Sequence, residues 1–430
     1  MKYAVLILFT LTLTNAQAQR LTLENAIDIA LKNSLDIQLS KNNVTIAQLN
    51  NSVGMAGGLP VIGATAVDNY SFIGVNQKLN TGEVIKRTGA NANNVNANLT
   101  AGILLYNGNR ARSTKRRLDE LELRSKDELN SEVQNIMAAA MTAYFDIVRQ
   151  QGYIKTIDVA IEVAKKKLNI VKTQQSVGLA NNADLFQSQV DLNNLEQSRV
   201  SQQLIVDQAK AELLRLLTLN ADSTINVEDT IQVDRTLALE ATLNRLTANA
   251  DILAADKQVR INQLIIKETA AQRYPTVKAS TGYSYTQNNA LAGQLLLNKS
   301  YGPVVGLSLN IPIYNGNVYK RQQKIAEVNA EIASVQKDIL MRDYSANVVK
   351  TYKAYSATLQ QLDNQQKNYD LAKELLDLVL QRFQLRQATI IDLSQAQQSF
   401  VTAGFTLINY SFVAKSAEIE LKRVSNLLAL

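Results

Sequence analysis

The sequence predicts a mainly α-helical chain that also contributes strands to a membrane β-barrel, with two internal repeats. Three observations indicate this fold: a duplicated set of motifs, very long stretches without Pro or Gly, and short stretches in which apolar and polar residues alternate. The chain has 430 residues with only 4 Pro and 17 Gly. Because so few turn-forming residues cannot serve many short strands, long helices are expected to dominate.

The duplication is recognised from motifs that recur at a constant distance along the chain. Leu105–Arg110 reads LYNGNR and Ile313–Asn317 reads IYNGN, so their tyrosines are 314 − 106 = 208 positions apart. Asp184 and Asp392, each followed by Leu, are also 392 − 184 = 208 positions apart. One structural element is therefore expected to occur twice.

The offset also predicts how the chain is organised. The first repeat is expected at 19–217 and the second at 250–430, each with a helix, two barrel strands and two long coiled-coil helices. Residues 218–249 lack a long periodic pattern and are expected to form a small side region between the repeats.

Four strands are expected from alternating residues. Along 97–105 and 305–313 every second residue is apolar, and those between are mostly polar or small. This period suits a barrel strand with one face against lipid, although a half-buried strand of a soluble sheet is the alternative. The expected strands are about 61–79 and 95–106 in the first repeat, and about 276–297 and 301–314 in the second. The residues expected to face lipid are Leu99, Ile103, Leu307 and Leu309.

Very long helices are expected after each Tyr-Asn-Gly-Asn motif. No Pro or Gly interrupts 317–385, which as a helix would be roughly 100 Å long. Apolar residues at heptad spacing predict packing as coiled coils with solvated outer faces. The first repeat has the corresponding helix at about 109–176, and after turns at 178–183 and 386–391 the chain returns as helices at 184–217 and 392–428.

The first 18 residues read as a secretory signal. Lys2 supplies the positive start, residues 4–14 form a short apolar core, and Ala16–Ala18 resembles a small-x-small cleavage site. Later parts of the sequence lack the roughly 18 uninterrupted apolar residues of a transmembrane helix. The exported chain is therefore expected to be periplasmic, secreted, or part of an outer-membrane β-barrel.

The composition argues against catalysis. The chain has no His and no Cys, so it lacks the commonest general base, the usual transition-metal ligands and the thiol nucleophile. The net charge of +7 is modest for this length and does not call for nucleic acid. We therefore expect no enzymatic activity, no cofactor, no metal site and no nucleic-acid partner.

The four expected strands cannot cross a membrane as a single open sheet. Unpaired backbone groups at the sheet edges would lie in hydrocarbon, so the strands must close with copies from other chains. Three copies give about twelve strands, in the range where a barrel encloses an aqueous lumen. Helices joined to the same strand ends would continue that tube, which predicts a conduit.

Several motifs in this order resemble the TolC-type outer membrane efflux family over essentially the whole mature chain. They are Leu21–Ile27 (LTLENAI), Leu59–Pro60 with Tyr274–Pro275, Val305–Gly316 (VGLSLNIPIYNG), and Ser176–Leu179 (SVGL) ahead of Asp184–Leu185. The resemblance implies an outer-membrane exit channel for efflux or type I secretion. It implies a homotrimer with a twelve-stranded β-barrel, an α-helical tunnel in the periplasm and an equatorial side domain. It also implies a periplasmic membrane-fusion adaptor and an inner-membrane pump of RND or ABC type.

The resemblance also implies a gate at the periplasmic entrance. Asp184 and Asp392 match acidic positions of the family, and Phe383 matches an aromatic gate position. The pattern departs at Arg386, which replaces the usual turn Gly, and at Gln395, which replaces a second Asp. Helix N-capping is the alternative role for the two aspartates. The turn residues expected to dock the adaptor are Val177, Gly178, Leu179, Leu185 and Leu393.

Two alternatives stay open from the residues alone. Basic clusters follow both strand-to-helix junctions and are expected either to contact anionic outer-membrane lipid or to form a solvated face. They are Arg110, Arg112, Lys115, Arg116 and Arg117, with Lys320, Arg321 and Lys324. The competing function is a periplasmic or surface coiled-coil scaffold without channel activity, which leaves the amphipathic strands unexplained.

Overall fold

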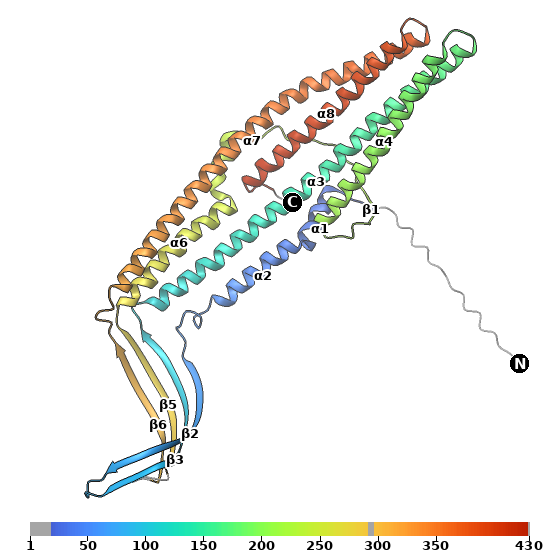
Figure 1. Cartoon of the computed structure of the whole chain (residues 1–430). Helices are drawn as coiled ribbons and strands as arrows, with labels where there is room; N and C mark the ends of the chain where they lie inside the picture. Colours follow the sequence, from blue (N-terminus) through green and yellow to red (C-terminus); the bar gives the residue numbers. More distant parts are fainter. Residues whose placement is uncertain (1–18, 291–295, 429–430) are drawn as a thin grey trace, which may run out of the picture. The chain divides into compact units, whose positions relative to one another are not determined.

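The computed structural model describes residues 19–290 and 296–428 (Figure 1), so the expected signal segment lies outside the described residues. The chain divides into two compact units. The helical unit comprises Met1–Ser40, Leu129–Ala250 and Met341–Leu430, and the sheet unit comprises Lys41–Glu128 and Asp251–Leu340.

The sheet unit contains four antiparallel strands in the order β2-β3-β5-β6. The first repeat supplies β2 (Val61–Lys78) and β3 (Val84–Tyr106), and the second supplies β5 (Thr276–Ala290) and β6 (Leu297–Asn310). The two pairs join where β3 is hydrogen-bonded to β5. The predicted fold of long helices with four strands per chain is confirmed.

The expected limits of three strands were wrong. β5 ends at Ala290 instead of about 297, because Leu297 is already the first residue of β6. β3 begins at Val84 instead of about 95, because it continues to pair with β2 beyond a register shift between Ile73 and Val75. Backbone pairing does not require the apolar alternation from which the strand was predicted. β6 spans Leu297–Asn310 instead of 301–314, and it ends ahead of Pro312, which has no N–H to donate.

The sheet unit also contains α6 (Ala250–Ala270), except for its first residue, and most of α2 (Leu35–Asn50). α2 ends at Asn50. The side-chain amide of the next residue, Asn51, donates to the carboxylates of Asp119 at 3.0 Å and Glu122 at 2.7 Å. After α6, the short 3₁₀ helix η2 (Ala271–Arg273) leads into β5.

Two helical hairpins form most of the helical unit (Figure 1). One consists of α3 (Arg110–Ser176) and α4 (Asn182–Leu216), the other of α7 (Val318–Gln384) and α8 (Ile390–Val424). α3 and α7 have 67 residues each, and their first parts belong to the sheet unit. Gly152 lies inside α3, where a Cβ would be only 3.1 Å from the Ile408 side chain on α8. The close approach of α8 therefore explains why this position has no side chain.

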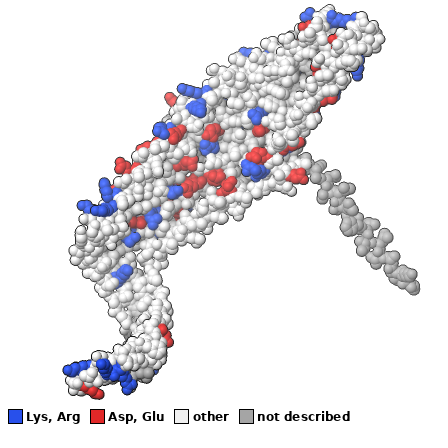
Figure 2. All heavy atoms as spheres, viewed as in Figure 1, with Lys and Arg blue, Asp and Glu red and all other residues white. Residues whose placement is uncertain are grey.

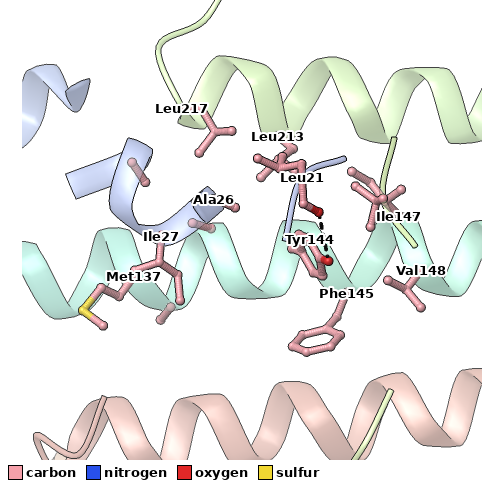
Figure 3. Close-up of a cluster of buried hydrophobic side chains, with 14 of the residues drawn as sticks. Leu21, Ala26, Ile27, Met137, Tyr144, Phe145, Ile147, Val148, Leu213 and Leu217 are labelled. Carbon is pink, nitrogen blue, oxygen red and sulfur yellow. Dashed lines mark hydrogen bonds between the residues drawn. The ribbon is translucent and has the colours of Figure 1, made fainter. Parts of the chain in front are cut away.

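A buried cluster ties the N-terminal part of the chain to α3 and α4 (Figure 3). Tyr144 on α3 is 1% exposed, and its hydroxyl donates to the backbone oxygen of Leu21 at 3.2 Å. Leu213 and Leu217 pack into the same cluster. They help to position α1 (Leu23–Asn33) and the two-residue strand β1 (Gln19–Arg20), which pairs in parallel with β4 (Ile225–Asn226).

Residues 218–249 contain only short elements, α5 (Leu239–Asn244) and the 3₁₀ helix η1 (Leu246–Ala248) besides β4. A buried carboxylate fixes this segment: Glu418 on α8 accepts from the backbone N–H of Asp234 at 2.9 Å. Hydrogen bonds from Thr236 and from the ammonium group of Lys422 hold the pKa of Asp234 well below its usual range. The side region is therefore anchored by charge as well as by apolar contacts.

Candidate functional site

The sheet has one apolar face. Paired residues of neighbouring strands point to the same side, and Ile103 is paired with Ala279, which is paired with Leu307. All four residues expected to face lipid lie on this side, and Leu307 is 72% exposed. We call this side the apolar face; over the middle of the sheet its residues are Ile62, Ala64, Ala66, Ala97, Leu99, Ala101, Ile103, Ala279, Tyr283, Tyr285, Tyr301, Pro303, Val305, Leu307 and Leu309, with Thr281 as a polar exception.

The opposite side, which we call the polar face, has mostly hydroxyl and amide side chains or Gly. Two cross-strand hydrogen bonds lie on it: Ser284 donates to Asn98 at 2.8 Å, and Thr286 donates to Asn96 at 3.0 Å. Its residues over the same stretch are Thr65, Asn96, Asn98, Thr100, Gly102, Lys278, Ser280, Gly282, Ser284, Thr286, Ser300, Gly302, Gly306 and Ser308, with Val61, Gly63, Val67, Leu104 and Val304. A sheet with these two faces fits a boundary between lipid and water.

The outer strands of the sheet, β2 and β6, have no second partner among the described strands. Each therefore presents a row of unpaired backbone N–H and C=O groups. Figure 2 shows few charged side chains over the middle of the strands, whereas Lys and Arg gather at the β2–β3 hairpin. The two edge strands themselves carry few charged residues, Asp68 and Lys78 on β2 and Lys299 on β6.

The turns at the ends of the two helical hairpins share one backbone geometry. At the α3–α4 turn, Gly178 has φ 76°, and the N–H of Leu179 donates to the carbonyl oxygen of Gln174 at 2.8 Å. At the α7–α8 turn, Arg386 has φ 63°, and the N–H of Gln387 donates to Arg382 at 2.7 Å. Arg386 thus takes the left-handed conformation usual for Gly at a helix end, at a cost of about 1 kcal/mol.

The proposed alternative role of Asp184 and Asp392 as N-caps was wrong. The N-caps are Asn181 and Thr389, and the two aspartates lie three residues later. Asp392 completes a capping box, because its carboxylate accepts from the backbone N–H of Thr389 at 2.8 Å while its own N–H donates to the Thr389 hydroxyl at 3.1 Å. Hydrogen bonds donated to the carboxylate by the backbone N–H and the hydroxyl of Thr389, with a smaller contribution from Arg382, lower the pKa of Asp392.

Two other expected site residues are buried within the chain. Phe383 is 5% exposed and Leu393 is fully buried, and both pack with Phe400 in an apolar cluster between the hairpins. Their burial contradicts the expectation that Phe383 lines a gate and that Leu393 docks an adaptor. Near the turn, each helix has one face toward its partner helix. The geometry of the turn, and not the sequence motif, decides which residues lie on that face.

Arg386, Asp392 and Gln395 lie at the surface of the α7–α8 hairpin, whereas Asp184 is half-buried at the start of α4. Asp392 and Gln395 line a groove of about 420 Å³ together with Arg382. Arg386 is exposed at the adjoining turn. The groove therefore places one carboxylate beside a guanidinium group and a neutral amide, and its net charge is smaller than an acidic ring implies.

Exposed apolar side chains surround both turns. Val177 and Leu179 are 62% and 55% exposed, whereas Leu185 is half-buried. Sequence reasoning missed three more, Phe186, Leu385 and Ile391, which are 65%, 69% and 72% exposed. Leu385 could have been found from the repeat, because it lies 385 − 177 = 208 positions after Val177.

Sequence reasoning also missed a buried cation between the hairpins. The Lys167 side chain on α3 is 0% exposed, and its ammonium group donates to Asp191 on α4 at 2.6 Å and to the Ser394 hydroxyl on α8 at 3.1 Å. In the sequence, the sign of this buried cation was a lysine on an apolar helix face, four residues after Val163 and four before Val171. Its partners lie far away in the sequence.

Neither a helical membrane span nor a metal site is found in the part of the chain that the structure describes. None of these helices is both long and apolar enough to cross a membrane. No three metal-binding side chains of the described residues gather in one place.

The two-faced sheet, its open edges and its helical hairpins define a class of integral membrane protein whose strands meet lipid on one side. The sequence profile of the family "Outer membrane efflux protein" matches residues 26–218 and 244–427, which correspond to the two repeats. This chain therefore belongs to the outer membrane efflux protein family, a channel family of the outer membrane and not a family of enzymes.

Individual relatives are distant in sequence. The chain is similar to "Outer membrane protein TolC" of Escherichia coli (strain K12), with 23% identity over 307 residues that cover 67% of this chain and 61% of that protein. An uncharacterized protein of Haemophilus influenzae is 20% identical over 295 residues, covering 68% of this chain and 64% of its own length. The matches thus span less than two thirds of these curated relatives.

Solved structures match over more of the chain. The outer membrane protein VceC of Vibrio cholerae has a TM-score of 0.78 at 18% identity, covering 94% of this chain and 95% of that one. The Campylobacter jejuni CmeC outer membrane channel has a TM-score of 0.75 at 16% identity, covering 94% and 85%. CusC has a TM-score of 0.76 at 16% identity, covering 94% and 91%. These similarities establish the fold.

Proposed function

We propose that this chain forms a passive outer-membrane exit channel of a tripartite efflux or type I secretion system, leading from the periplasm to the exterior. The observation that carries the proposal is the four-stranded sheet with an exposed apolar face, a polar face and two unpaired edges. A coiled-coil scaffold would need none of these features. Family membership also favours the channel over the scaffold.

The open edges support a homotrimer. In hydrocarbon each unpaired backbone group costs several kcal/mol, so β2 of one copy must pair with β6 of the next. Three copies of the four-stranded sheet make a closed barrel of twelve strands. With the apolar face outward, the polar face then lines an aqueous lumen.

The first prediction is that the protein is a trimer that requires detergent for extraction. Native mass spectrometry in mild detergent should give three times the chain mass, because only closure removes the strand edges. Extraction by high salt alone is the control and should release nothing, since the apolar face is held by lipid and not by charge. A monomer stable in detergent, or release by salt, would contradict the closed barrel.

The exposed turns support docking of a periplasmic membrane-fusion adaptor, and through it of an inner-membrane pump of RND or ABC type. Val177, Gly178 and Leu179 present an exposed apolar turn, and Leu185 contributes its half-exposed edge. Exposed apolar groups of this kind commonly mark protein contacts. Leu393 is not included, because it is fully buried.

Part of the basic junction is free to contact anionic outer-membrane lipid. Lys115 pairs with Asp119 at 2.5 Å and Arg117 with Glu268 at 2.7 Å, so these two have internal partners. Lys324 likewise pairs with Glu327 at 3.1 Å. The exposed candidates for lipid head groups are Arg110, Arg112, Arg116, Lys320 and Arg321.

The second prediction concerns the entrance. In a trimer Asp184 and Asp392 contribute about six carboxylates, which attract cations at low salt. Replacing both by Asn should reduce cation selectivity and block by multivalent cations added from the periplasmic side, in single-channel recordings. Because the pKa of Asp392 is lowered, its charge should persist into more acidic solution than that of an ordinary carboxyl group.

The entrance variant has a structural control. Asp392→Asn also removes the carboxylate of the capping box, so Thr389→Ala, which disrupts the same cap but keeps the charge, separates the two effects. The acidic role requires that Thr389→Ala leave selectivity unchanged. Unchanged selectivity and block in the double Asn variant would show that the two aspartates do not set the ion selectivity of the entrance.

A further inference from the structure

The polar face of the sheet carries very little charge. Over the strand residues that the structure describes, only Lys278 and Arg87 are charged on this side. Arg87 lies beyond the register shift, in the outer part of the β2–β3 hairpin. Lys278 lies near the start of β5, which begins at Thr276, and therefore at the end of the sheet where the strands meet the helices.

Lys278 has no acidic neighbour on its face. It is paired with Leu104 on β3 and with Ser308 on β6, and its side chain is exposed. The structure shows no ion pair between Lys278 and any described residue. Arg110 and Lys320, the nearest charged residues in sequence after β3 and β6, are cations too. They add to the positive charge at this end of the sheet.

We propose that Lys278 makes the helix-proximal end of the barrel lumen positive, so that this segment attracts anionic solutes during transport. The proposal rests on the proposed function, because the polar face bounds a lumen only in the closed barrel. Twelve strands spaced about 4.8 Å apart and tilted by about 40° enclose a radius of roughly 12 Å. Three ammonium groups around this circumference face one aqueous space.

Salt concentration decides how far this charge acts. The Debye length is about 10 Å at 0.1 M salt and about 30 Å at 0.01 M. At 0.01 M the fields of the three lysines therefore overlap across the whole lumen. At 0.1 M the electrostatic field of each lysine reaches only its immediate neighbours. The nearest of these is Ser308 on the adjacent strand, whose Cβ lies about 5 Å away.

A charge-matched labelling experiment tests the proposal directly. The chain contains no cysteine, so Ser308→Cys places a single thiol beside Lys278. Its modification rates are measured in proteoliposomes with two water-soluble methanethiosulfonates, one carrying a sulfonate and the other a quaternary ammonium group. At 0.1 M salt, adding Lys278→Gln should lower the sulfonate-to-ammonium rate ratio about threefold, and at 0.01 M by up to about tenfold.

Two matched variants complete the design. Lys278→Arg keeps the charge and should keep the ratio. Ser300→Cys lies on the same face 308 − 300 = 8 residues along β6, which is about 27 Å, so its ratio at 0.1 M salt should not depend on residue 278. A salt titration of the Ser308→Cys chain with Lys278 intact should lower the ratio as salt rises, and this needs no change at Lys278.

The outcomes distinguish a failure of the closed barrel from a failure of the role proposed for Lys278. A thiol at 308 that reacts with neither water-soluble reagent, but with a lipid-soluble maleimide, would overturn the closed barrel and hence the proposed function. A thiol that reacts with both reagents, at a ratio insensitive to Lys278→Gln and to salt, would leave the channel intact and overturn the role of Lys278.

Discussion

Replacing Leu307 by Arg is expected to destabilise the membrane-embedded protein by about 2–4 kcal/mol if this residue lies near the bilayer midplane. Leu307 lies on the apolar face of the sheet and is 72% exposed within the single chain. In the closed barrel its side chain would meet hydrocarbon, where a guanidinium group loses its hydration without gaining a partner. Urea titration of the protein in lipid vesicles measures the change in the free energy of unfolding.

Ser308→Arg is the matched control for this prediction. The residue is the immediate neighbour on β6 but lies on the polar face, where the guanidinium group would stay in water. Its cost should therefore be much smaller than that of Leu307→Arg. Equal costs at the two positions would show that the two faces of the sheet do not meet different solvents, and the lipid-facing assignment of Leu99, Ile103 and Leu309 would be lost with it.

Periodic features of the fold could be predicted from the sequence, and features fixed by local geometry could not. The long helices follow from 67-residue stretches with heptad-spaced apolar residues, and each end lies within two residues of the expected position. The strands follow from period-two alternation. The outer part of the β2–β3 hairpin was missed because its pairing depends on backbone hydrogen bonds and a bulge, which leave no such pattern.

The candidate site was predicted less well for the same reason. Asp184 and Asp392 were placed at the correct helix ends, but Asn181 and Thr389 were not recognised as the capping residues. The burial of Phe383 and Leu393 depends on how the returning helix is rotated, which a motif does not record. Lys167 was visible as a lysine in an apolar seam, but its partners on α4 and α8 come together only through tertiary packing.

The buried ammonium group of Lys167 gives the prediction with the second large effect. Its interaction with Asp191 joins α3 to α4, and its hydrogen bond to Ser394 joins this hairpin to α8. Asp191→Asn keeps the shape of the side chain but removes the only carboxylate within hydrogen-bond distance of Lys167 among the described residues. Removing one partner of a buried pair typically costs 3–5 kcal/mol, and because Asp191 is 26% exposed we expect about 2–4 kcal/mol.

The same hairpin offers a matched control for this effect. Arg199 on α4 and Asp158 on α3 also form an ion pair, at 2.6 Å, but both side chains are 45% exposed. Asp158→Asn should therefore cost at most about 1 kcal/mol, since water solvates the remaining charge. The urea midpoint followed by helical circular dichroism, multiplied by the slope of the unfolding transition, gives each change in free energy.

Lys167→Met completes the cycle, because it removes the buried charge itself. In the Asp191→Asn background this change should recover most of the lost stability, since no unpaired ammonium group remains inside the protein. If Asp191→Asn costs no more than Asp158→Asn, or if Lys167→Met recovers nothing, the ammonium group reaches water by another route. The contact between the hairpins near their turns would then depend on the apolar cluster of Phe383, Leu393 and Phe400 alone.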